Sequence, residues 1–368
     1  MRSYLRTFLV TALTVGLIAF FLRNAQIDRV WASMRGARVD LLIASLIVAA
    51  VSYLVRVERW RRLLQPVGAP SFWSTNRATL IGFAANALLP GRVGEVLRPY
   101  VLAKREGFSG AAAFGTVVVE RLLDLLVIVL SVAGFVLVAE SPTKDPKLLA
   151  TLRTAAVTGG AGAVVILVMM VWLARSSART EQVMRWCVSV APKRSTRFVA
   201  EIGQRFLQGL AVVGRPGPLI VAMSLSVVLW LSVAYGMWLT SLAFGIGVSF
   251  GEAVILMGMV AIGVAVPTPA GVGGYHAAYE LGATSLYGAG VDQAVAAALV
   301  MHMLAFLPLM LPGLVLMAQE GLRLGSLSRL AVNRESSGEM SGSQAISCPS
   351  DRVQAMPLVR GEDGRSGS

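Results

Sequence analysis

Long uncharged stretches separated by short charged segments are the main pattern along this chain. A helix that crosses a bilayer needs about 20 mostly apolar residues. We predict six spanning helices, at about 4–22, 40–56, 110–138, 154–174, 217–243 and 293–318. The second stretch is short, so we expect the arginines at its end, beginning with Arg56, to snorkel toward the interface.

Two further apolar stretches, 77–103 and 250–287, are broken by proline and glycine. A helix that faces lipid cannot be interrupted in this way, because the freed amide and carbonyl groups would find no water to bond. We therefore predict two broken or re-entrant elements. The residues expected to break or hinge the helices are Pro90, Gly91, Gly94, Pro267, Pro269, Gly271, Gly273 and Gly274.

The two broken elements also resemble each other. The sequence PGRVGE at 90–95 aligns with PAGVGG at 269–274, with proline, valine and glycine in register, so that Gly94 matches Gly273. Each half of the chain then contains two spans, a broken element and a third span. Provided that each broken element returns to the side it entered, each half crosses the membrane an odd number of times, and the second copy is inverted. In many transporters, inverted repeats of this kind place the site near the midplane, where discontinuous helices meet. The predicted fold class is an all-α, polytopic helical membrane protein with an inverted repeat.

The distribution of basic residues predicts the orientation of the spans. With the N-terminus inside, the cytoplasmic segments hold 25 Lys and Arg residues and the outer segments hold 7. By the positive-inside rule, both termini are cytoplasmic, and the two broken elements enter from opposite sides. We expect a membrane domain over 1–322, a disordered cytoplasmic tail over 323–368, and a location in the bacterial inner membrane.

Composition excludes a water-soluble globule, because only 14% of the residues are charged, compared with roughly 25% in soluble domains. Lys and Arg outnumber Asp and Glu by 33 to 20, which in a membrane protein favours anionic lipid headgroups over nucleic acid as the partner. Only two cysteines occur, Cys187 and Cys348, so neither a disulfide framework nor a cysteine-ligated metal site is predicted.

Ionisable residues at membrane depth cost about 2.5–3.5 kcal/mol each, and here they are concentrated in two short segments. On a helix that follows Gly91, the residues Arg92, Glu95 and Arg98 share one face. The third span carries Glu120, Arg121 and Asp124. Three arginines and three carboxylates would neutralise one another in one polar cluster. The cluster would either join the broken element to the third span, or hold an anion such as a lipid phosphate through the bidentate fork of arginine.

Several other polar residues accompany the two broken elements. Asn86 precedes the first break, where it would either cap a helix or line a cavity. His276 and Glu280 follow the second break at i,i+4 spacing, and we interpret them as a polar lining of the same cavity rather than a metal site, since the usual third ligand is absent. Ser109 and Asp292 each precede a span and are predicted to be N-caps.

The sequence offers little support for catalysis. It has no Gly-x-Ser-x-Gly elbow, no Walker loop and no dinucleotide-binding glycine fingerprint on a strand-to-helix turn. Glu120 and Asp124 could act as an acid–base pair, but the longest cytoplasmic loop, 175–216, is too small to form a donor pocket. We predict no catalytic residue, no cofactor and no metal.

Three motifs in order make the chain resemble the lysylphosphatidylglycerol synthase transmembrane family, also called flippase-like integral membrane proteins. They are NALLPGRVGEVLR at 86–98, ERLLD at 120–124 and PTPAGVGG at 267–274, and the resemblance covers about residues 1–322. It implies a module that translocates lipid between leaflets, here without the aminoacyl transferase domain of well-studied members. Gly274-Tyr275-His276 stands where members often have a carboxylate.

The sequence therefore predicts a flippase-like protein that moves an anionic or modified lipid, or a lipid-linked amphiphile, across the membrane. The alternatives are an integral-membrane enzyme that modifies lipid, a non-catalytic partner of such an enzyme, and a scaffold without transport. The expected partners are the lipid substrate and a separate lipid-synthesising enzyme, and no oligomeric state is predicted.

Overall fold

The computed structural model of this chain is helical, and it contains no strand among the residues that it describes. Those residues are 12, 14–89, 92–138, 146–174, 176, 182, 209, 213, 216–266 and 268–321. Three of the predicted hinge residues, Pro90, Gly91 and Pro267, lie outside the described residues, as does the predicted tail at 323–368.

Four of the described helices are long and apolar enough to cross a membrane. They are α3 (Val39–Leu63), α6 (Gly110–Val138), α10 (Pro216–Ala243) and α13 (Val291–Gln319). A fifth helix, α7 (Pro146–Ala174), has a shorter apolar stretch over Arg153–Met169. Residues 14–22 are also helical, and the short helix α2 (Ile27–Arg35) follows them. The prediction of a polytopic helical membrane protein is confirmed.

Helix α3 is longer than the predicted second span, which was expected to end at Arg56. It continues to Leu63, and Arg59 in this extension is completely buried instead of snorkelling to the interface. The physical reason is that carboxylates of α6 lie at ion-pair distance from the Arg59 guanidinium. A charge that is neutralised inside the protein does not have to mark the end of a span.

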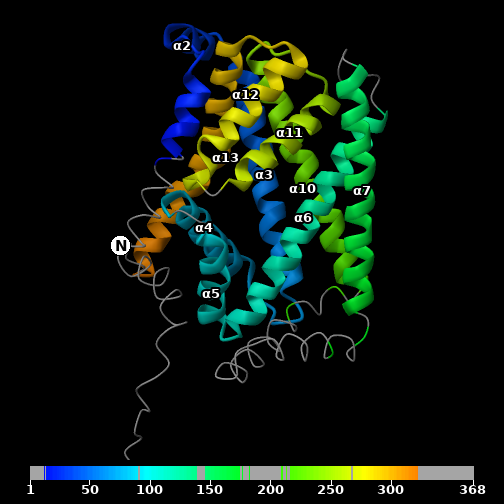
Figure 1. Ribbon diagram of the computed structural model, residues 1–368. Coiled ribbons are helices and arrows are strands. Elements are labelled where there is room, and N and C mark those ends of the chain that lie inside the picture. The colour runs from blue at the N-terminus through cyan, green and yellow to red at the C-terminus, as the bar shows by residue number, and fades with distance from the viewer. Residues whose placement is uncertain are drawn as a thin grey trace, which may run out of the picture. The chain divides into compact units, whose positions relative to one another are not determined.

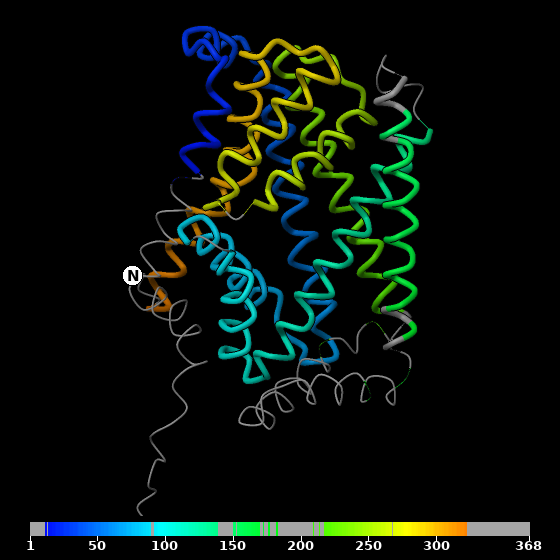
Figure 2. The backbone as a smooth tube through the Cα atoms, viewed as in Figure 1, coloured from blue at the N-terminus to red at the C-terminus, as the bar shows by residue number. Residues whose placement is uncertain are grey.

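Two pairs of short helices form the predicted broken elements. The first pair is α4 (Phe72–Leu88) with α5 (Gly94–Glu106). The second pair is α11 (Phe250–Ala265) with α12 (Gly274–Tyr287), joined through the 3-10 turn η2 (Pro269–Gly271). None of the four helices exceeds 17 residues, so none is long enough to span a bilayer alone. In Figure 2 each pair folds back on itself as a hairpin.

The two hairpins are built on the same close contact between glycines. A Cβ on Gly94, the first residue of α5, would overlap the carbonyl oxygen of Gly82 in α4. A Cβ on Gly274, the first residue of α12, would overlap the carbonyl oxygen of Gly263 in α11. The structural counterpart of Gly94 is therefore Gly274, one residue beyond the Gly273 that the sequence alignment paired with it.

The hairpins pack against opposite ends of α6, as the inverted repeat predicts. Arg98 of α5 pairs with Glu120 in the N-terminal half of α6. Phe250 of α11 lies edge-on to Phe135 in the C-terminal half of α6, with ring centroids 5.9 Å apart. Figure 1 shows α4 and α5 toward one end of the spanning helices, and α11 and α12 toward the other. The two broken segments therefore approach the interior from opposite directions.

Of the two predicted N-cap residues, Ser109 caps its helix and Asp292 does not. Ser109 does cap α6, because its Oγ accepts a hydrogen bond from the Ala112 N–H at 3.4 Å. Asp292 does not cap α13, whose N-cap is Gly290. Its Oδ1 instead accepts the N–H of Gln26 at 2.7 Å, and so satisfies the backbone where α2 begins.

Candidate functional site

The tips of the two hairpins touch through Arg92. Its Nη2 donates a hydrogen bond to the carbonyl oxygen of Val264 at 2.6 Å, in the last turn of α11. A cation at a helix C-terminus is favoured because it satisfies carbonyls that lack helical partners. Arg92 has φ of 54°, in the left-handed region that a residue with a side chain rarely adopts, so the contact is made at the expense of local backbone strain. Glu95 lies 3.6 Å from the same guanidinium.

Asn86 acts as a cap for the first hairpin. Its Oδ1 accepts a hydrogen bond from the N–H of Gly94 at 2.7 Å, where α5 begins. The first of the two roles considered for this residue, satisfying a freed backbone group, is therefore the one observed.

Three side chains form the centre of a buried charged cluster. Arg59 of α3 lies 3.0 Å from an oxygen of Glu120 and donates a short hydrogen bond to Asp124. Arg59 and Glu120 are fully buried, and Asp124 is 4% exposed. The two carboxylates lie one turn apart on α6, so one guanidinium reaches both of them. Arg59 also donates to the hydroxyl of Ser226 on α10 at 2.9 Å.

Two further arginines complete the ion pairs. Arg98 donates to Glu120 at 2.7 Å, and its guanidinium carbon lies 4.0 Å from the centroid of the Trp60 ring. Arg121 donates to Glu120 at 2.9 Å and lies 3.2 Å from Asp124. The structure thus joins Arg98 of the broken element to Glu120, Arg121 and Asp124, as the sequence predicted.

Helix α10 and the end of α3 add residues that sequence analysis missed. Trp230 of α10 donates its indole N–H to Asp124 at 2.8 Å. Arg56, half-buried on α3, has its guanidinium carbon 6.0 Å from the ring centroids of Trp230 and Phe83. A signal for Arg56 and Arg59 was present in the sequence, because they continue the face of α3 that carries the buried Ser52 at three- and four-residue spacing.

The cluster is not neutral. Its ionisable members among the described residues are Arg56, Arg59, Arg98, Arg121, Glu120 and Asp124. Four guanidinium groups face two carboxylates, which leaves two positive charges in excess. The sequence predicted three arginines and three carboxylates; instead, Arg92 and Glu95 form a pair of their own at the hairpin tip, from which the charge of Glu95 still acts on Arg121. We call the six residues the arginine cluster.

Hydrogen-bond donors in the arginine cluster are left without acceptors. Within the described part of the chain, the Nε atoms of Arg59, Arg98 and Arg121 and the Nη2 of Arg59 are buried and have no hydrogen-bond partner, against a single unpartnered acceptor in the cluster, the Oδ2 of Asp124. A buried donor without a partner is costly, especially on a charged group. Such donors fit an anion with several acceptor oxygens, which arginine recognises through its planar fork.

The residues predicted in the second hairpin lie in a different set of contacts. His276 is buried, with its Nδ1 3.3 Å from the Gly273 N–H, and its ring centroid lies 4.7 Å from that of His302. His302 in turn is 3.0 Å from the carbonyl oxygen of Ala270 in η2. Glu280 is half-buried on the same helix as His276. No group of three or more His, Cys, Asp or Glu among the described residues is arranged to hold a metal ion.

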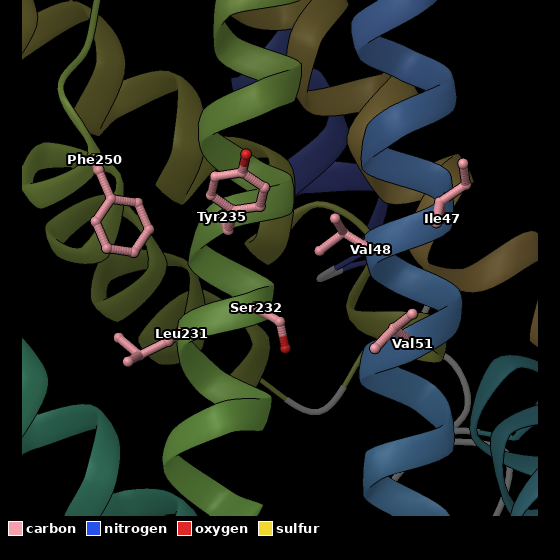
Figure 3. Close-up of a pocket in the computed structure, with 7 residues that line it drawn as sticks. All are labelled: Ile47, Val48, Val51, Leu231, Ser232, Tyr235 and Phe250. Atoms are coloured by element: carbon pink, nitrogen blue, oxygen red, sulfur yellow. The ribbon is translucent and has the colours of Figure 1, made fainter.

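An apolar groove runs between α3 and α10. It has a volume of about 380 Å³. Its lining, shown in Figure 3, consists of Ile47, Val48, Val51, Leu231, Ser232, Tyr235 and Phe250. None of these side chains is charged, so the groove offers hydrocarbon contacts but no headgroup chemistry.

The fold and the site together define a polytopic helical membrane protein in which two re-entrant hairpins meet beside a largely buried charged cluster with an excess of arginine. The sequence profile of the lysylphosphatidylglycerol synthase TM region matches residues 7–313, and the chain belongs to this family. The resemblance predicted from the three sequence motifs is therefore confirmed.

One relative carries a different functional name. The protein named Glycosyltransferase AglD, from Haloferax volcanii, is 29% identical to this chain over 153 residues. The match covers 41% of this chain and 24% of the relative, so the chain aligns with about a quarter of that protein's length. Together with the family, it supports a membrane protein whose role is related to lipids.

Proposed function

We propose that this protein moves the anionic headgroup of a membrane lipid between the leaflets of a bacterial inner membrane, with both termini in the cytoplasm. The observation that carries the proposal is the arginine cluster, in which the half-buried Arg56 and Arg121 add positive charge to a buried, balanced core beside two re-entrant hairpins that approach from opposite ends. A scaffold would need the ion pairs, but the positive charge in excess of the two carboxylates would not strengthen it.

The cost of carrying a charged headgroup through hydrocarbon is the barrier that such a protein has to lower. A single charged side chain at the bilayer centre costs about 2.5–3.5 kcal/mol on insertion scales, and simulations give larger values. Fixed guanidinium groups replace the water that the headgroup loses, while the apolar chains stay in the surrounding lipid. Arg92 and Arg121 are suited to the first contact, because their side chains are 38% and 37% exposed.

The remaining residues position these cations. Glu120 and Asp124 fix the guanidinium planes of Arg59, Arg98 and Arg121 through direct ion pairs. The contact of Arg92 with Val264 links the two hairpin tips. Breaking and re-forming this contact would let the hairpins open alternately toward the two leaflets.

A transport assay on Arg98 tests the proposal. The full chain is reconstituted into liposomes that carry a fluorescent anionic lipid, and dithionite quenching reports the lipid that reaches the outer leaflet. We expect Arg98→Gln to lower the rate about tenfold or more, since hydrogen bonds to charged groups contribute about 1.5–3 kcal/mol. Arg105→Gln is the matched control, because Arg105 lies on the same helix but pairs at the surface with Glu320.

The result that contradicts the proposal is an unchanged rate in Arg98→Gln, or a wild-type rate equal to that of empty liposomes. The name of the Haloferax relative favours a second candidate, an enzyme that modifies lipid or its membrane partner. A covalently altered lipid, found by mass spectrometry after incubating purified protein with lipid and a sugar donor, would support that candidate instead.

A further inference from the structure

The excess charge of the arginine cluster can be assigned in part to one residue. Glu120 and Asp124 are shared among Arg59, Arg98 and Arg121, which leaves one positive charge over. The second comes from Arg56, which has no carboxylate within ion-pair distance among the described residues. Its guanidinium lies instead beside two aromatic rings.

Unsatisfied donors accompany this excess. The side chains of Arg59 and Arg98 are 0% and 8% exposed, and the Nε of each lacks an acceptor in the described part of the chain. These donors belong to residues whose other nitrogens already hold Glu120. A group that satisfies these donors must therefore bring both negative charge and several acceptor oxygens.

We propose that the headgroup carried by this site is a dianionic phosphate, a phosphomonoester or diphosphate lipid, and that Arg56 sets its preference over monoanionic phosphodiesters. This inference rests on the proposed function and names its substrate class. Two negative charges balance the arginine cluster, whereas a phosphodiester leaves one positive charge and a cationic headgroup adds a third. Terminal phosphate oxygens also supply the acceptors that the Nε donors lack.

A competition experiment on the full chain tests the charge preference. The protein in phosphatidylcholine nanodiscs receives equal amounts of phosphatidic acid and phosphatidylglycerol at pH 7.5, and native mass spectrometry counts the lipids retained. We expect phosphatidic acid to be enriched about tenfold, the factor that corresponds to about 1.4 kcal/mol. Equal retention of the two lipids, or enrichment of phosphatidylglycerol, overturns the proposal.

Substitution of Arg56 tests the assignment of the excess charge. Arg56→Gln should abolish most of the enrichment, while Arg56→Lys, which keeps the charge, should retain it. Arg61→Gln is the matched control on the same helix, because Arg61 pairs with Glu58, which also holds Arg62. Undiminished enrichment in Arg56→Gln, or an equal loss in Arg61→Gln, contradicts the role of Arg56.

A pH series with unmodified protein keeps the proposal testable if Arg56→Gln does not fold. The second pKa of a phosphate monoester is about 6, so phosphatidic acid gains its second charge as pH rises from 5.5 to 7.5. Its retention relative to phosphatidylglycerol should rise over this range, and a flat ratio overturns the dianion assignment.

Inorganic phosphate is the remaining source of the same chemistry. It is expected to displace phosphatidic acid only at a large molar excess, because it lacks the acyl chains. Displacement at equal concentration assigns the site to free phosphate and overturns the lipid assignment. If lipids move in the transport assay without any charge preference, the dianion inference is wrong while the proposed function stands. If no lipid moves, the proposed function itself is wrong.

Discussion

Replacing Arg59 with methionine tests whether the arginine cluster holds the membrane domain together. The substitution keeps an apolar chain of similar length but removes the ion pairs to Glu120 and Asp124 and the hydrogen bond to Ser226. Removing one partner of a buried charge network typically costs about 3–5 kcal/mol.

The structure places the expected effect at the lower end of this range. Glu120 keeps Arg98 at 2.7 Å and Arg121 at 2.9 Å, so it does not become an isolated buried charge. Asp124 keeps the indole of Trp230 at 2.8 Å. We therefore expect Arg59→Met to lower the free energy of unfolding by about 3 kcal/mol.

Unfolding in mixed micelles by titration with sodium dodecyl sulfate, followed by tryptophan fluorescence, measures this change. Arg61→Met on the same helix is the control: Arg61 is 36% exposed and its partner Glu58 retains Arg62 at 2.6 Å. Exposed ion pairs contribute about 0–1 kcal/mol, so the control should stay below about 1 kcal/mol. Equal losses in the two variants would refute the reasoning.

A double variant separates the ion pair from its surroundings. Adding Asp124→Leu to Arg59→Met removes both charges, and the combined loss should be smaller than the sum of the single losses by about 1 kcal/mol or more. Strict additivity would show that Arg59 and Asp124 stabilise the fold independently.

Three further predictions concern the hairpins and their supports. Gly94→Ala should lower stability by about 1–3 kcal/mol in the same titration, since its Cβ overlaps a carbonyl oxygen, whereas Gly134→Ala, which has open space around it, should change stability by less than about 0.5 kcal/mol. Similar values for the two would contradict the close contact. Arg92→Ala should speed hydrogen exchange at the end of α11, where the tip contact is lost, and unchanged exchange argues against that contact. Asp292→Ala should speed exchange of the Gln26 amide about tenfold, because that N–H loses its acceptor; the same rate in both proteins would show that the bond is not protective.

Much of the fold follows from local features of the sequence. The spanning helices are predicted by uncharged length, and the hairpins by proline and glycine, because both depend on the chemistry of a backbone in lipid. The end of α3 is not predictable in this way. Arg59 lies in a segment that looks like a solvated boundary, and only its tertiary neighbours Glu120 and Asp124 show that it is internal.

The register of the repeat has the same limitation. Gly271, Gly273 and Gly274 offer several alignments with Gly94, and local sequence does not distinguish them. The choice of Gly274 depends on a carbonyl oxygen in α11, eleven residues earlier in the chain. The composition of the arginine cluster was predicted only in part. Glu120, Asp124, Arg98 and Arg121 were named from the sequence, but the predicted balance of charge was wrong because the other two arginines come from α3.

We interpret this charge balance as favouring a binding cluster over a purely structural one. Two arginines would suffice to neutralise Glu120 and Asp124 and to join α5 to α6 and α3. The two further arginines, Arg56 and Arg121, carry the excess and are only half-buried, so their charges stay accessible to an approaching anion. Under the proposed function, a bound anion balances this excess charge.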